Sequence, residues 1–395
     1  MAITKTDPFG SSLRLYLSVD IVGSTAFKHS SGDKFDQSGE DENDLPPAAP
    51  WFSPIAQFYK GMDQAFAREW AICVERAERV KWSTGNSPEL WKSIGDELVY
   101  TKLVTDNRQV LTTLNAWTRA VSSYRERLRV QFKSLDLKST AWIAGFPVHN
   151  SEVFFRKSDL ERRVEDDEDD AVYSNLFLLH QFAEKGVDSG LVRDYIGPAI
   201  DTGFRLGQLS TPRKLVISVE MALLLIKAIR AQPSDEDYGY EKPRIFFDGR
   251  QSLKGVFGGL PYPIFWVDMR PSPSLEESED KLNKREQLNT DDALSFCQEF
   301  IKANAPFCFT PYIEGNPDPD FTQVPEHHQR RLKGLRAFWE RENVKRQVEK
   351  VSTAQKEGEP DAAGTRADVN VAELAKMIVD RSLGSLGASN EKEQS

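Results

Sequence analysis

The stretch LRLYLSVDIVGSTAFKH, Leu13–His29, runs from apolar residues into a carboxylate and then into small residues. The β-branched and aromatic residues from Leu13 to Val22 predict a strand that ends before Gly23. A carboxylate near the end of an apolar strand suggests a specific structural or functional role. Asp20 can cap the next helix, or it can bind a ligand at the edge of a sheet.

The composition is that of a soluble globular chain. Its 395 residues are 39% hydrophobic and 28% charged, and the formal net charge of -10 argues against a nucleic-acid surface. The most apolar run, LVISVEMALLLIKAI, contains Glu220 and Lys227, which argues against a membrane span. The first residues, MAITKTDPFG, lack the apolar core of a signal peptide.

The three cysteines, Cys73, Cys297 and Cys308, are dispersed. They make neither a disulfide framework nor a zinc site, so we expect a reducing compartment and a cytoplasmic protein.

Working outward, strand and helix patterns alternate along most of the chain. Apolar periodicity predicts helices over 51–79, 107–132, 291–303 and 325–351, and a further helix around Phe204 and Leu206. Runs of β-branched and aromatic residues predict strands over 140–148 and 214–219. Turn residues between such runs predict hairpins within 90–104 and 244–269. Residues 30–50 read as a surface insertion. The order predicts an α+β fold, with a sheet covered by helices on one side.

We expect three regions along the chain. Residues 1–271 form a catalytic domain, 272–351 a helical extension, and 352–395 a polar and mostly disordered tail.

A second acid, Asp96, follows Gly95 at the predicted hairpin tip. Two carboxylates at the ends of neighbouring strands can share two divalent metal ions, the usual equipment for moving a phosphoryl group. The loop Val22–Thr25 would then let backbone N–H groups approach phosphate oxygens at a helix start. Taken singly, Asp20 is more simply a cap and Asp96 a turn residue.

Three ordered motifs, SVDIVGSTAF, WKSIGDELVY and DYIGPAIDTGFRL, together resemble the catalytic domain of class III nucleotidyl cyclases. The resemblance covers about Leu13–Met269 with long insertions, and it implies a ferredoxin-like βαββαβ core. It also implies that Asp20, Asp96 and the carbonyl of Ile21 bind two divalent cations, Mn²⁺ or Mg²⁺. The residues matching the family's phosphate-binding loop are Val22, Gly23, Ser24 and Thr25.

The other motifs imply the second half of the site. Lys92 and Asp194 match the family's base-reading pair, Asp201 stands at the ribose-orienting position, and Arg205 matches the transition-state arginine. Positions 201 and 205 are one helical turn apart on one face. Family members place the two halves across a head-to-tail dimer, so we expect a homodimer with two composite sites.

One position departs from the family pattern. Asp201 occupies a place where the family usually has Asn. A carboxylate accepts a hydrogen bond from a ribose hydroxyl but cannot donate one, and it repels phosphate. Either the sugar is held differently, or the chain belongs to a specialised branch.

The Lys92–Asp194 pair can read adenine, cytosine or uracil, whereas guanine fits poorly. The early start of the cyclase core and its insertions resemble the Pycsar antiphage cyclases. That resemblance implies conversion of UTP to 3′,5′-cyclic UMP, which acts on a separate effector protein. Cyclic CMP from CTP, or cyclic AMP from ATP, remain alternatives. Trp91 beside Lys92 can narrow the base pocket, although a core role is simpler for a tryptophan.

Two other classes of protein are less consistent with the sequence. A catalytically dead nucleotide-binding module would have lost Asp20, Asp96 or Arg205, and all three are present. A palm-type polymerase would need a basic template surface. The pair His327-His328 suggests a metal site, but adjacent side chains should splay apart and no third ligand is near in sequence, so we expect a solvated helix start.

Overall fold

The computed structural model describes residues 9–36, 48–156, 171–186, 190–270 and 273–357. They fall into two compact units. The larger comprises residues 10–153 and 193–328, and the smaller comprises the described parts of 1–9, 154–192 and 329–395. The predicted disordered tail lies outside the described residues from position 358 onward.

The larger unit is built on a βαββαβ core. Its elements are β1 (Ser12–Val22), α1 (Ser24–Asp36), α2 (Phe52–Arg79), β2 (Glu89–Ile94), β3 (Glu97–Val104), α3 (Arg108–Gln131) and β4 (Asp136–Phe146). The strands lie in the order β2-β3-β1-β4, and β1 is antiparallel to both β3 and β4. This is the order of a ferredoxin-like fold, so the predicted fold class is confirmed.

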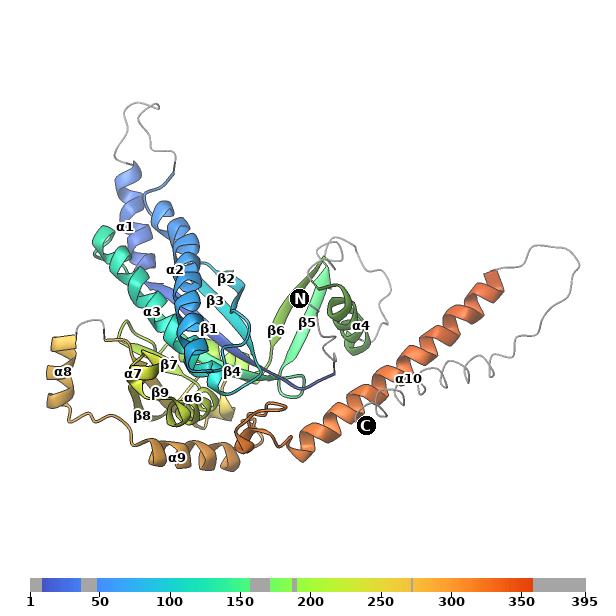
Figure 1. Cartoon of the computed structure of the whole chain (residues 1–395). Coiled ribbons are helices and arrows are strands. Elements are labelled where there is room, and N and C mark those ends of the chain that lie inside the picture. The colour runs from blue at the N-terminus through green and yellow to red at the C-terminus, as the bar shows by residue number, and fades with distance from the viewer. Residues whose placement is uncertain (1–8, 37–47, 157–170, 187–189, 271–272, 358–395) are drawn as a thin grey trace, which may run out of the picture. The chain divides into compact units, whose positions relative to one another are not determined.

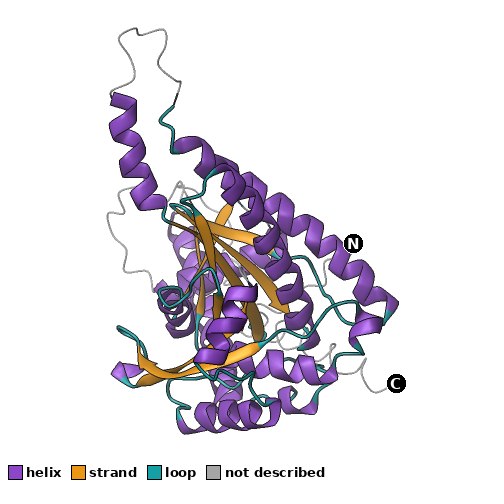
Figure 2. Cartoon of the chain, turned by 90° about the vertical axis from the view of Figure 1, so that its left-hand side faces the viewer, coloured by secondary structure: helices purple, strands orange, loops and turns teal. Residues whose placement is uncertain are grey.

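The sheet continues beyond β4. The strands β7 (Lys214–Ile217), β9 (Pro261–Asp268) and β8 (Ile245–Ser252) follow in space, and β7 runs parallel to β4. The remaining elements of this unit are α5 (Pro198–Leu206), α6 (Val219–Ala231), α7 (Asp235–Tyr238), η3 (Phe257–Gly259), α8 (Pro273–Leu282), α9 (Thr290–Ala303) and η4 (Pro319–Phe321). Figure 2 shows the strands backed by helices.

The alternation in β1 separates the two faces of the sheet. Leu15, Leu17 and Val19 are fully buried in the main apolar cluster, which also holds apolar residues of α2 and α3. Both helices lie along this side of the strands (Figure 1). Tyr16 and Asp20 therefore project from the opposite face.

A second, smaller cluster covers part of that opposite face. It is formed by Tyr16, Val99, Trp142, Ala144, Phe146, Tyr195 and Ile200. Gly203 of α5 lies against Trp142, where a Cβ atom would come within 2.2 Å of the indole ring. Only glycine permits this approach of α5 to β4, so the position of α5 on the sheet is tightly defined. The expectation of helices on one side of the sheet is therefore wrong, because α5 covers part of the opposite face.

The smaller unit contains α4 (Ala171–Lys185) and most of α10 (Glu326–Glu357). Tyr173 of α4 stacks on Trp339 of α10 with ring centroids 5.3 Å apart. The strands β5 (Ser151–Arg156) and β6 (Leu191–Ile196), which each pass from one unit to the other, form a two-stranded sheet.

Most predicted elements form close to their expected bounds. The helices predicted over 51–79, 107–132 and 291–303 are α2, α3 and α9. The strand predicted over 140–148 starts earlier, at Asp136, because its first residues pair with the end of β1. Residues 30–36 of the expected insertion are helical, since α1 runs on to Asp36. None of the described helices has the length and apolar character needed to cross a bilayer.

Candidate active site

The strand register brings the two predicted metal ligands to one end of the sheet. Asp20 of β1 lies opposite Glu97, the first residue of β3, and Asp96 occupies the turn just before it. The N–H of Ile21 donates to the carbonyl oxygen of Asp96 at 3.3 Å. β1 itself continues two residues past Asp20, because Ile21 and Val22 still pair with β4.

The backbone of Ile21 supports its expected role. In an antiparallel strand, the N–H and C=O of one residue point toward the same neighbouring strand. Because the N–H of Ile21 points to the turn that holds Asp96, its carbonyl projects to that side too. A carbonyl oxygen therefore accompanies the two carboxylates.

Two lysines pair with these carboxylates. Lys138 Nζ lies 3.1 Å from Asp20 Oδ2, and Lys28 Nζ lies 3.2 Å from Asp96 Oδ1. The hydroxyl of Ser24 also donates to Asp96. Burial raises the pKa of Asp20 despite the opposing effect of Lys138, and the charge of Asp96 raises it further.

A third acid, Glu97, lies beside the two predicted metal ligands and was not among the predicted site residues. Its carboxylate accepts a hydrogen bond from Ser18, and burial is the main cause that raises its pKa. The charges of Asp20 and Asp96 raise this pKa as well. The hairpin register contained the signal, because a turn at Gly95-Asp96 places Glu97 first on β3, beside the strand that carries Asp20.

This donor set fits divalent cations that prefer oxygen. Three carboxylates, those of Asp20, Asp96 and Glu97, lie near the Ile21 carbonyl, and two lysines provide the only positive charges paired with them among the described residues. Carboxylate and carbonyl oxygens suit Mg²⁺ and Mn²⁺. Lys138 contacts one oxygen of Asp20 and Lys28 contacts one oxygen of Asp96, so the two ammonium groups would compete with a metal ion for these oxygens.

The loop after β1 has the form expected of a phosphate cradle. Gly23 has φ +86°, and a Cβ there would lie 2.7 Å from the carbonyl oxygen of Ser134. Helix α1 starts at Ser24, and the N–H of Phe27 donates to the carbonyl of Gly23. Gly23 and Thr25 are exposed, whereas Ser24 is buried and bonded to Asp96. The exposed start of the helix can therefore accept an anion.

The predicted base-reading pair is in direct contact. Lys92 Nζ lies 2.9 Å from Asp194 Oδ1, and both side chains are about one third exposed. Trp91 Nε1 donates to the same oxygen at 3.0 Å, and the Lys92 ammonium lies 3.9 Å from the Trp91 ring centroid. Trp91 is half-buried, so it joins the pair and packs on the second cluster at the same time.

Asp201 and Arg205 lie on α5 and are exposed. Between them, Gly203 and Phe204 face the sheet, and the Phe204 ring lies 6.0 Å from Lys92 Nζ and 6.2 Å from Trp91. The helix therefore stands next to the base-reading pair. Within the described residues, no hydrogen bond or ion pair joins Arg205 to the carboxylates at the end of β1.

The two halves share one face of the sheet. Lys92 pairs with Val99, Val99 pairs with Ser18, and Asp20 lies two residues further along β1. Two residues of strand span about 7 Å. Lys92 and Asp20 thus belong to neighbouring rows of side chains, on strands separated by β3.

His327 and His328 do lie at a helix start, and His327 is exposed, but the expectation that the pair is solvated and lacks a third ligand is wrong, because His328 is buried. A third imidazole, His149, lies near both, and the two adjacent rings have centroids only 4.6 Å apart. The fold supplies the partner that sequence proximity could not show.

No family model and no curated protein matches this chain. Among solved structures, the adenylyl cyclase CyaB from P. aeruginosa is similar, with 12% identity, a TM-score of 0.38, and coverage of 65% of this chain and 94% of that one. The guanylate cyclase domain of RhGC from Catenaria anguillulae, solved with GTP, has 10% identity, a TM-score of 0.33, and coverage of 65% and 97%.

Proposed function

We propose that this chain is a nucleotidyl cyclase of the class III type, which converts UTP to 3′,5′-cyclic UMP and diphosphate. One observation carries the proposal: Asp20 and Asp96 lie at the same end of the sheet, joined through Ile21 and followed by the Gly23 loop. In the reaction, the ribose 3′-hydroxyl gives up its proton to solvent, and its oxygen bonds to the α-phosphorus. The bond from that phosphorus to the bridging oxygen breaks, and diphosphate leaves with the electron pair.

Asp20, Asp96 and the carbonyl of Ile21 would hold two divalent cations, Mn²⁺ or Mg²⁺. When bound, such ions lower the pKa of the 3′-hydroxyl and neutralise the triphosphate. Glu97 adds negative charge beside these ligands and holds Ser18. Lys28 and Lys138 keep the carboxylates compensated before substrate arrives, and their released ammonium groups can then face phosphate.

The loop Val22–Thr25 binds the β- and γ-phosphates. Its positive-φ glycine brings the backbone close to the bound anion, and the free N–H groups at the start of α1 favour negative charge. Ser24 fixes Asp96 rather than phosphate in this state.

Arg205 stabilises the charge that develops on the α-phosphate, since its planar donors match phosphate oxygens. Asp201 accepts a hydrogen bond from a ribose hydroxyl one turn earlier on α5. Both side chains are exposed and free to reach a nucleotide held by a partner subunit. This favours a homodimer whose two sites each combine residues of both protomers.

The Lys92–Asp194 pair reads the uracil edge. Lys92 has N–H donors beyond the one bonded to Asp194 and gives one to O4. Asp194 accepts from N3–H, and among the described residues nothing occupies its Oδ2. Cytosine has the reverse pattern, with a donor at position 4 and an acceptor at position 3, so neither Lys92 nor Asp194 would be matched. A mispaired buried group costs roughly 1–3 kcal/mol, so UTP is favoured over CTP by about tenfold to a hundredfold.

The biological role follows from the Pycsar resemblance. We infer a cytoplasmic enzyme of antiphage defence, whose cyclic nucleotide acts on a separately encoded effector. This part of the proposal rests on the resemblance of the sequence alone.

The test is incubation with each of the four nucleoside triphosphates and Mn²⁺, followed by identification of the product by mass spectrometry. We expect cyclic UMP from the wild-type chain and none from Asp96→Ala, while Asp292→Ala, an exposed acid on α9, keeps full activity. Turnover by Asp96→Ala at saturating Mn²⁺ would overturn the metal assignment. Faster turnover of ATP than of UTP would leave an adenylyl cyclase, and a preference for CTP would change only the base assignment.

A further inference from the structure

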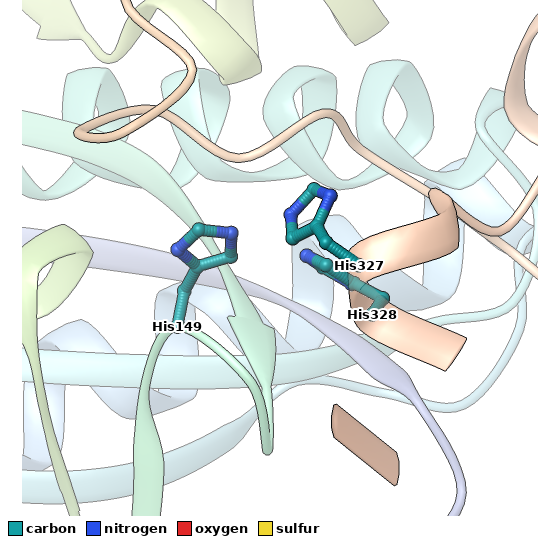
Figure 3. Close-up of side chains that lie close together, drawn as sticks. All are labelled: His149, His327 and His328. Atoms are coloured by element: carbon teal, nitrogen blue, oxygen red, sulfur yellow. The ribbon is translucent and has the colours of Figure 1, made fainter. Parts of the chain in front are cut away.

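Three of the five histidines meet in the larger unit, away from the carboxylates. His149 follows β4 in a turn, and His327 and His328 are in the first turn of α10. One ring nitrogen of each lies within 4.8 Å of one ring nitrogen of the other two. Figure 3 shows the three rings gathered around a common space.

The ring geometry explains how adjacent residues can serve one site. The rings of His327 and His328 are nearly perpendicular, at 87°, with centroids 4.6 Å apart. The His149 ring lies 5.0 Å from His328 and 6.1 Å from His327. The turn after β4 therefore places the imidazole of His149 close to the rings of both His327 and His328.

Three ring nitrogens of this cluster are buried without a hydrogen-bond partner among the described residues. His328 is only 4% exposed, and both its ring nitrogens are buried without a partner among the described residues. Nε2 of His149 is in the same condition. A buried polar atom without a partner costs free energy, so a group that binds these nitrogens would stabilise the fold.

The surroundings favour the neutral form of two of the rings, those of His149 and His328. Burial is the main cause that lowers the pKa of His328 to about 4, and the two neighbouring histidines contribute to this shift. Burial also lowers the pKa of His149. A neutral imidazole offers a lone pair to a metal ion, whereas three imidazolium ions would repel one another.

We propose that His149, His327 and His328 bind one Zn²⁺ ion, with a fourth position open to water. Three histidines are a regular zinc ligand set, and imidazole suits zinc better than it suits Mg²⁺ or Mn²⁺. Zn–N bonds of about 2.1 Å place tetrahedral nitrogens about 3.4 Å apart, so small side-chain rotations close the site. His327 is exposed and gives the ion a way in from solvent. The site joins the turn after β4 to the start of α10.

The test measures zinc directly. The full chain, without a polyhistidine tag and carrying Asp96→Asn to weaken the acidic site, is stripped with chelator and dialysed against Zn²⁺. Metal per chain is then counted by mass spectrometry. We expect about one Zn²⁺ per chain, and a higher melting temperature with zinc than without, because zinc binds the folded state.

Two variants and one control decide the assignment. His327→Gln, at an exposed position, should weaken zinc binding by about 100-fold or more and abolish the thermal shift, while the stripped protein folds as before. His149→Gln should do the same from the other segment. His29→Gln, an exposed histidine on α1, should leave zinc content unchanged. An Asp96→Asn chain that takes up no zinc, or zinc content unaffected by both site variants, would overturn the proposal.

Discussion

Lys92 and Asp194 already form an ion pair before any base is bound, with Nζ and Oδ1 2.9 Å apart. Trp91 donates to the same oxygen, so that one oxygen has two side-chain donors. The pair is thereby held in orientation, and its outward-facing atoms are the ones left for a nucleobase. In the proposed site, base reading by this pair is separate from metal binding by Asp20 and Asp96, since Asp20 lies two positions further along the sheet.

Lys92→Ala should lower kcat/KM for UTP by about tenfold to a hundredfold, because a hydrogen bond from a charged group contributes about 1.5–3 kcal/mol. The Mn²⁺ concentration for half-maximal activity should stay the same. Steady-state kinetics at varied UTP and Mn²⁺ check both statements. Lys254→Ala, an exposed lysine outside the site, is the control. A shift in the Mn²⁺ requirement with unchanged kcat/KM for UTP would contradict the role of Lys92.

Glu220 gives a prediction for pH. Burial raises the pKa of Glu220 from 4.5 to about 7, although hydrogen bonds with Tyr262 and Cys308 act in the opposite direction. His149 lines the same small cavity. The folded state therefore holds a proton that the unfolded chain releases between pH 4.5 and 7. This stabilising contribution is complete below pH 4.5 and is lost as pH rises through 7.

The size of that contribution is about 3 kcal/mol, from a shift of about 2.5 pKa units. Glu220→Gln cannot titrate, so its free energy of unfolding relative to wild type should improve by about that amount between pH 4.5 and pH 8. Urea unfolding across this range is the measurement, with the exposed Glu299→Gln on α9 as control. Parallel curves for wild type and Glu220→Gln would show that Glu220 ionises normally.

Single residues also show where sequence reasoning stops. The meeting of Asp20 and Asp96 is predictable, because both flank adjacent strands. The position of Glu97 beside Asp20 was also predictable, since the hairpin turn fixes the register of the strand that begins with Glu97. His149 was not, because it lies far from His327 in sequence and in a turn with no periodicity. The ion pairs of Lys28 and Lys138 with these acids were not predictable either, because they depend on how the elements pack in three dimensions.

Among the elements, α5 depends on a single glycine. Gly203→Ala would place a methyl group within 2.2–2.5 Å of the buried Trp142 ring. Overpacking of this kind costs about 1–3 kcal/mol, which exceeds the gain of about 1 kcal/mol in helix propensity. The displaced helix would also misplace Arg205, so activity should fall together with stability.

The matched control is Gly334→Ala on α10, where a Cβ would meet no atom within 4 Å. Thermal unfolding should show a lower melting temperature for Gly203→Ala and none of this loss for Gly334→Ala. An unchanged melting temperature for Gly203→Ala would mean that α5 moves freely on the sheet.

Helices and strands were predictable where the hydrophobic pattern extended over many residues or a turn signal was strong. The helices α2 and α3 and the β2–β3 hairpin match their predicted positions because amphipathic periodicity and a Gly-Asp turn are strong local signals. The joining of β7, β9 and β8 to the same sheet was not specified, because apolar strands fit many neighbours. Helix α10 passes the predicted end at residue 351 because no breaking residue stands before Gly358.

At the scale of the whole molecule, both half-sites lie on one chain, and the proposed homodimer would contain two of each. Asp20→Ala and Arg205→Ala damage different halves. When the two inactive proteins are mixed and exchange subunits, each heterodimer regains one intact site. Random exchange gives heterodimers in half of the dimers, so about one quarter of wild-type activity should return.

Activity of the mixture is measured after exchange has been shown by native mass spectrometry. A mixture of two preparations of Asp20→Ala is the control and should stay inactive. Absence of rescue despite exchange would place the whole site within one protomer.

Trp91 makes this protein able to report its own ligand. Its indole contacts both members of the base-reading pair and the aromatic cluster behind them. A base that takes up Lys92 and Asp194 changes the electric field on that indole, and therefore its fluorescence. Comparing wild type with Trp91→Phe isolates this signal from the other tryptophans. Base preference then becomes an optical titration, which works in a variant that cannot turn over, and selectivity in binding can be separated from selectivity in chemistry.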